Sequence, residues 1–178
     1  MPHERNRTSR PPLDAEGLER LALFYAGRYA TTRARLRAYL KRKVAERGWS
    51  GASGAPIDAL ADRLAGLGYV DDKAFAASRA ASLTRRGYGE RRVRDALVAA
   101  GIDEEDAADA RAQAREAGWQ AALRFAERRR LGPFADEEPD RPGRERAMAA
   151  MLRAGHPIEI VRRLVTSRPG EIPESDAF

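Results

Sequence analysis

The sequence contains no cysteine and only two histidines among its 178 residues. The absence of cysteine excludes a disulfide framework and every zinc site that uses thiolate ligands. No apolar run approaches the roughly 20 residues that a membrane-spanning helix requires. The basic residues near the N-terminus are not followed by an apolar segment, so we do not expect a signal peptide. The sequence therefore predicts a cytoplasmic protein with no membrane partner.

Residues that would support catalysis are scarce as well. His3 lies in a polar segment, and His156 precedes a proline at an expected helix start, where a turn residue is favoured over a metal ligand. Neither the Walker A motif nor the Rossmann glycine motif occurs. Asp71 and Asp72 are adjacent carboxylates, but capping of a helix explains them more simply than a divalent-cation site does. We therefore expect no enzymatic activity, no cofactor and no metal site.

What the sequence has in abundance is charge. Lysine and arginine total 33 against 27 acidic residues, which gives a formal net charge of +6. A basic surface suits a polyanionic partner, and arginine binds phosphate or carboxylate through two parallel hydrogen bonds. Codon bias in a GC-rich genome would also raise the arginine and alanine content, so only part of this excess indicates a partner.

Helical periodicity runs through most of the chain, and no alternating run of strand length occurs. We recognise nine helices in three sets of three. Matching aromatic residues stand 50 residues apart in the first helix of each set, at Tyr25, Phe75 and Phe125. This pattern predicts an all-α fold of three tandem three-helix repeats that form an elongated, curved array. The alternative is one globular helical bundle whose similarities arise from composition.

The expected boundaries follow the glycines and prolines between helices. The three-helix repeats are expected at residues 16–68, 69–115 and 116–167, the last with a proline-rich acidic loop at 132–143. Residues 1–15 and 168–178 are polar and aperiodic, so we predict a disordered N-terminal arm and a disordered C-terminal tail.

Two groups of basic residues are candidates for binding a partner. One lies on the helix expected between Thr32 and Gly48, and it comprises Arg33, Arg35, Arg37, Lys41 and Arg42. The other lies in the middle repeat, and it comprises Arg85, Arg86, Arg91, Arg92 and Arg94. Each arginine alone is most simply a solvated charge. The hypothesis of a binding surface therefore rests on the two clusters.

Residues 68–103 contain a specific pattern. The stretch GYVDDKAFA is followed by an Arg-Arg-Gly-Tyr-Gly turn, an Arg-Val-x-x-Ala-Leu helix and a Gly-Ile-Asp step, and it resembles the RecX family of recombination regulators. We expect the matching residues to be mainly architectural, with glycines turning the chain and apolar residues packing. The matching positions are Gly68, Tyr69, Val70, Asp71, Asp72, Phe75, Ala76, Gly87, Gly89, Arg92, Val93, Leu97, Gly101 and Ile102.

The resemblance implies a function as well as a fold. It implies a non-enzymatic regulator of homologous recombination, DNA repair and the SOS response that lies in the groove of a RecA filament on single-stranded DNA. Such a protein restrains ATP hydrolysis, strand exchange and co-protease activity. The implied partners are RecA and single-stranded DNA, with duplex DNA as a further candidate, and we expect a monomer. His156 departs from the family pattern, since an aromatic residue is common at that position.

Two other functions stay open at this point. The chain would be a direct DNA-binding protein if one helix pair acted as a helix-turn-helix, and it would then bind duplex DNA without RecA and with a steep salt dependence. It would be a general helical-repeat adaptor if it bound an acidic protein and neither RecA nor DNA.

Overall fold

The computed structural model describes residues 11–175. They divide into two compact units, of which unit 1 ends at Asp72 and unit 2 begins at Lys73. Within the described range there are nine α-helices, one short 3-10 helix and one isolated β-bridge, and no strand. The prediction of an all-α fold is confirmed for this range. No helix among the described residues is both long enough and apolar enough to span a membrane.

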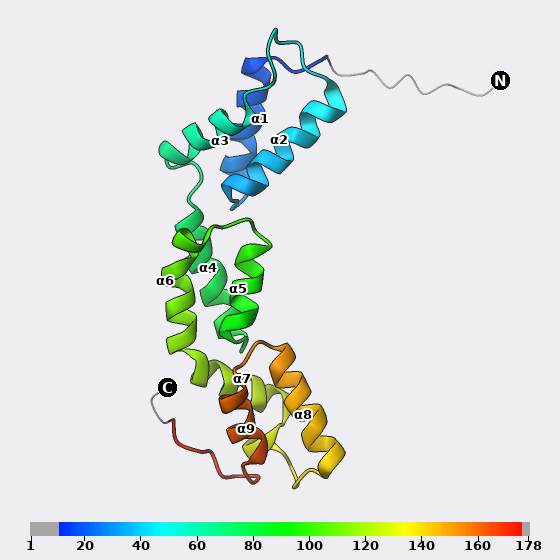
Figure 1. Cartoon of the computed structure of the whole chain (residues 1–178), viewed down its shortest axis with the longest axis vertical. Coiled ribbons are helices and arrows are strands. Elements are labelled where there is room, and N and C mark those ends of the chain that lie inside the picture. The colour runs from blue at the N-terminus through cyan, green and yellow to red at the C-terminus, as the bar shows by residue number, and fades with distance from the viewer. Residues whose placement is uncertain (1–10, 176–178) are drawn as a thin grey trace, which may run out of the picture. The chain divides into compact units, whose positions relative to one another are not determined.

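Unit 1 contains the first set of three helices. These are α1 (Ala15–Arg28), α2 (Arg33–Arg47) and α3 (Ile57–Gly66) (Figure 1). Each of the three contacts the other two, and leucines from all of them, including Leu18, Leu36 and Leu64, form one core. Helix α1 begins where the Asp14 side chain accepts a hydrogen bond from the Gly17 N–H at 2.8 Å, which is a standard N-cap.

The chain is ordered earlier than the predicted arm allows. Leu13 falls within the segment expected to be disordered, yet its side chain is buried in the core of unit 1. Its N–H donates to the Gly48 carbonyl at 3.0 Å, and its carbonyl accepts from the Ser50 N–H at 2.9 Å. Arg47 donates to the Pro11 carbonyl. These bonds attach residues 11–13 to the end of α2, while residues 1–10 lie outside the described range.

Unit 2 contains the other two sets of helices. They are α4 (Asp72–Arg85, whose first residue belongs to unit 1), α5 (Glu90–Val98), α6 (Glu104–Glu116), α7 (Gly118–Arg129), η1 (Gly132–Phe134), α8 (Arg141–Arg153) and α9 (Ile158–Thr166) (Figure 1). One core joins α4, α5 and α6, and a second joins α7, α8 and α9. Tyr88 packs against both cores. The helices of the described range therefore group in threes around separate cores.

Helix α8 begins earlier than the sequence analysis predicted. The proline-rich loop was expected to reach residue 143, but α8 begins at Arg141, and the Asp140 side chain accepts from the Gly143 N–H at 2.7 Å. Pro142 fits this first turn because its missing N–H would have no partner within the helix. The predicted C-terminal tail also makes a contact, since the Gly170 N–H donates to the Pro133 carbonyl at 2.8 Å.

The motif residues at the α3–α4 connection differ in their exposure. Gly68 has a φ of 79°, a backbone conformation that favours glycine. Val70, two positions later, is buried in the core of unit 1. Tyr69 was expected to pack, but 55% of its surface is exposed. Of these two neighbouring residues, only Val70 is buried in the core.

Candidate partner-binding surfaces

The basic residues of α2 are partly neutralised within unit 1. The Arg33 backbone N–H donates to Asp72 Oδ1 at 2.9 Å, and its Nε donates to Oδ2 at 3.2 Å. Arg37 lies 3.1 Å from an oxygen of Asp58 and 2.5 Å from one of Asp62, both on α3. Since Arg33 is the first residue of α2, Asp72 supplies an acceptor to the open N-terminus of that helix. These two arginines hold elements of unit 1 together.

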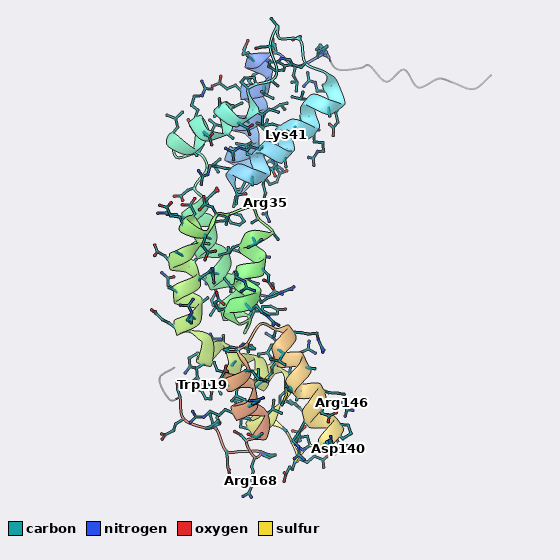
Figure 2. All side chains as sticks on the ribbon, viewed as in Figure 1. Arg35, Lys41, Trp119, Asp140, Arg146 and Arg168 are labelled. Carbon is teal, nitrogen blue, oxygen red and sulfur yellow. The ribbon has the colours of Figure 1, made fainter. Side chains whose placement is uncertain are left out.

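The second half of α2 keeps more free positive charge. Arg42 lies 3.6 Å and Lys43 2.6 Å from Glu46, and the hydrogen bond from Lys43 is the main reason why the pKa of the Glu46 carboxyl is lowered. Lys41 is exposed and makes no ion pair within residues 11–175. Figure 2 places Arg35 and Lys41 on α2.

The turn between α4 and α5 lies directly against the third set of helices. Gly87 has a φ of 78°, and a Cβ atom added there would lie 2.9 Å from the Phe125 nitrogen. The Gly89 N–H donates to the Ala154 carbonyl at 3.0 Å, and a Cβ atom on Gly89 would overlap the Gly155 carbonyl. Both glycines are needed because the backbones approach so closely that no side chain fits between them.

His156 fills the space behind this turn. Its side chain is buried, Nε2 donates to the Gly87 carbonyl at 3.1 Å, and the ring meets Phe125 edge-on with 5.6 Å between ring centres. Burial lowers the pKa of His156 to about 4, and the hydrogen bond to the Gly87 carbonyl opposes part of that shift. The imidazole is therefore neutral at pH 7, and it packs at a position where the resemblance leads us to expect an aromatic ring.

Predicted arginines of the middle repeat gather around the same turn. The guanidinium carbons of Arg86 and Arg92 lie 5.5 Å and 6.0 Å from the centre of the Tyr88 ring, so that two cations lie close to one half-buried tyrosine. Arg91 donates to the Leu152 carbonyl of α8. Arg94 lies further along α5, 3.3 Å from Asp95.

The structure adds arginines of α7 that sequence reasoning did not single out. Arg128 Nη1 donates to the Arg86 carbonyl at 2.5 Å, and Arg124 Nη2 donates to the Thr84 carbonyl at 3.3 Å. The run of arginines from Arg128 onward is visible in the sequence, but no local pattern places it beside the α4–α5 turn. We define the junction cluster as Arg85, Arg86, Arg91, Arg92, Arg124 and Arg128.

The junction cluster gathers guanidinium groups next to a small cleft. A cleft of about 220 Å³ lies between α4 and α6 with an alanine floor, and Arg85 and Arg124 are among its lining residues. Guanidinium groups bind carboxylate and phosphate oxygens through paired hydrogen bonds. Within residues 11–175 no group of acids and histidines is arranged to hold a metal ion.

Comparison with known proteins connects this geometry to a family. The family model described as "RecX, second three-helix domain" matches residues 71–110. The protein named Regulatory protein RecX in Myxococcus xanthus is 34% identical over 160 residues, which cover 85% of this chain and 86% of that protein. The protein of the same name in Pseudomonas syringae pv. tomato is 31% identical over 138 residues, which cover 76% and 83%.

A solved structure supports the fold. The crystal structure of RecX from Lactobacillus salivarius matches 85% of this chain and 94% of its own chain, with a TM-score of 0.63 and 18% identity. Gly87 and Gly89 lie in the segment that the family model matches, as do Arg85, Arg86, Arg91 and Arg92. This chain belongs to the RecX family of regulatory proteins.

Proposed function

We propose that this protein is a non-enzymatic regulator that binds in the groove of the RecA–single-stranded DNA filament and restrains its ATPase, strand-exchange and co-protease activities. The junction cluster is the observation that carries this proposal. Arginine forks around one turn suit an acidic protein surface and DNA phosphates alike. Family membership supports RecA as the partner, and the arginines of the cluster support this turn as the contact surface.

The junction cluster is better suited to this contact than the basic residues of α2. Within residues 11–175, Arg85, Arg86 and Arg92 make no ion pair with an acidic side chain, whereas Arg33 and Arg37 already face carboxylates. The turn is also held by backbone contacts to α7 and α8, so its arginines extend from a fixed base. Pre-organisation of this kind lowers the entropy that binding removes.

The first prediction tests the cluster by charge reversal. Arg86→Glu combined with Arg92→Glu should raise the concentration needed for half-maximal inhibition of RecA ATPase on single-stranded DNA by roughly tenfold or more, because attraction becomes repulsion at both arginines next to Tyr88. The measurement is ATP hydrolysis by RecA on single-stranded DNA with the protein present at substoichiometric amounts.

The matched control is Arg115→Glu combined with Arg146→Glu. Both residues are exposed on other helices of unit 2, and Figure 2 places Arg146 on α8. Each reversal lowers the net charge by two, so both double variants fall from +6 to +2. Circular dichroism checks that each variant stays helical. Equal inhibition by the two double variants would remove the junction cluster from the proposal, and duplex binding without RecA would favour a direct DNA-binding protein.

A further inference from the structure

We propose that three tyrosines of unit 1, with the cations around them, form a binding surface for single-stranded nucleic acid. We define the tyrosine platform as Tyr25, Tyr29 and Tyr39. The inference goes beyond the proposed function, since it adds a separate contact in unit 1 for an unpaired strand, and it can be tested without RecA.

The platform is a run of rings across α1 and α2. Tyr25 and Tyr39 are stacked, with ring centres 4.2 Å apart and an angle of 13° between the planes. Tyr29 continues the run at 5.3 Å from Tyr25, tilted by 49°. The first two rings are half-buried against the core of unit 1, whereas Tyr29 is 50% exposed. Tyr25 and Tyr39 are therefore held in place by the core, and Tyr29 beside them is accessible to solvent.

Positive charge surrounds these rings. The guanidinium carbon of Arg28 lies 5.8 Å from the Tyr29 ring centre, and Arg28 Nε donates to the Tyr29 hydroxyl at 3.3 Å. Arg42 and Lys43 lie 5.6 Å and 5.9 Å from the Tyr39 ring centre. Glu46, which faces Arg42 and Lys43, offsets one of these three charges. A net positive charge thus remains beside an exposed aromatic ring.

Rings and cations together favour an unpaired strand over other anions. Aromatic side chains stack on nucleobases, while neighbouring cations bind the phosphates that link them. An acidic protein segment would use the cations but would leave the tyrosine rings without a planar partner. Bases in a duplex are already stacked on each other, so their faces do not reach a protein ring. Single-stranded nucleic acid uses both features.

The test compares two strands that carry the same phosphates. Fluorescence anisotropy with a labelled 15-residue oligodeoxythymidylate and an abasic strand of equal length separates stacking from charge. The wild-type protein should bind the base-bearing strand roughly tenfold more tightly. Tyr29→Ala should remove that difference and leave the affinity for the abasic strand unchanged, whereas Tyr29→Phe should keep it.

Phe24→Ala is the matched control, because Phe24 is also an aromatic residue of α1 and is 61% exposed outside the platform. It should bind both strands as the wild type does. Equal wild-type affinity for the two strands would overturn the inference, even if Tyr29→Ala failed to fold. The inference would also be overturned if Tyr29→Ala lowered the affinity for both strands equally. If the wild-type protein bound the two strands equally but still inhibited RecA, the platform would be refuted and the proposed function would stand.

Discussion

The imidazole of His156 is buried against Phe125, and its Nε2–H is committed to the Gly87 carbonyl. Its Nδ1 has no hydrogen-bond partner among the described residues, so a second proton would enter the apolar interior without an acceptor. This is the physical reason why burial lowers the pKa of His156 to about 4. A titratable side chain here serves as a packing residue with one polar anchor.

The stability of the protein should therefore depend on pH through His156. The unfolded chain binds the proton near the ordinary pKa of 6.5, whereas the folded chain binds it only near 4. Stability is fully present above about pH 6.5, and it falls as the pH drops from 6.5 to 4, where the loss levels off. The loss from this one group should reach at most about 3 kcal/mol.

Urea denaturation at several pH values in that window measures the effect. The variant His156→Phe keeps an aromatic ring and removes the titrating group, so its free energy of unfolding should fall less steeply with decreasing pH than that of the wild type. Carboxylates titrate in both proteins and cancel in the comparison. Parallel curves for the two proteins would show that His156 does not carry the dependence.

Local sequence signals explain some residue roles and miss others. The capping of α2 by Thr32 depends on atoms a few positions apart, which the order of residues largely fixes. Asp72 instead contacts Arg33, 39 positions away. That partner depends on how three helices pack, so adjacent carboxylates in a sequence reveal only the preference for a helix start.

At the scale of whole elements, the contact between the α4–α5 turn and the end of α8 depends on glycines, which have no side chain to separate the two backbones. The Gly89 N–H bonds the Ala154 carbonyl and the Arg91 N–H bonds the Gly155 carbonyl, at 3.0 Å and 3.3 Å. Gly155 has a φ of 92°, and a Cβ atom there would collide with the backbone of Arg92. Two glycines thus permit two helix ends to share backbone hydrogen bonds.

A methyl group at this contact should be costly. Gly89→Ala places a Cβ atom against the backbone of Gly155 and His156, neither of which can move as a flexible side chain could. We expect the free energy of unfolding to fall by about 1 to 3 kcal/mol, as for other overpacked sites. Chemical denaturation followed by circular dichroism measures it.

Gly118→Ala is the control for the same substitution in the same unit. Its Cβ atom would meet only the Ile160 side chain, at an ordinary 3.9 Å, and it lies at the start of α7. That variant should be as stable as the wild type or slightly more stable, because alanine favours a helix over glycine. If Gly89→Ala were equally well tolerated, the close approach would not constrain the turn.

The positions of the helices along the chain were largely predictable, but which helices pack against each other was not. Spacing of apolar residues places each helix, because burial of one face requires a period near 3.6 residues. The start of α8 was missed since Pro142 and Gly143 break helices in most contexts but are tolerated in a first turn. Arg124 and Arg128 joined the junction cluster only when α7 was seen against the α4–α5 turn.

At the scale of the whole molecule, the aromatic spacing of 50 residues matches the separation of the described residues into three cores. Tyr25 packs against the core of unit 1, Phe75 against the core of α4–α6, and Phe125 lies within that of α7–α9. The sequence could not place the division between Asp72 and Lys73, because it falls inside α4. Periodicity marks helices, whereas compact units depend on contacts between them.

The separate cores lead to a prediction about unfolding. Each unit contains one tryptophan whose fluorescence can report on it. Trp49 packs against the core of unit 1, and Trp119 belongs to the core of α7–α9 in unit 2. They are the only two tryptophans, so Trp119→Phe and Trp49→Phe each leave a single reporter. Leu40→Ala in unit 1 and Leu164→Ala in unit 2 each open a cavity at a fully buried position.

Each truncation should remove about 2 to 5 kcal/mol of stability, and the loss should fall mainly on the core that contains it. Leu40→Ala should therefore lower the urea midpoint reported by Trp49 more than the midpoint reported by Trp119, and Leu164→Ala should do the reverse. Tryptophan fluorescence during urea titration of the single-tryptophan variants measures both. Equal shifts at the two reporters for either truncation would mean that the chain unfolds as one cooperative body, in which a cavity in one core destabilises every other.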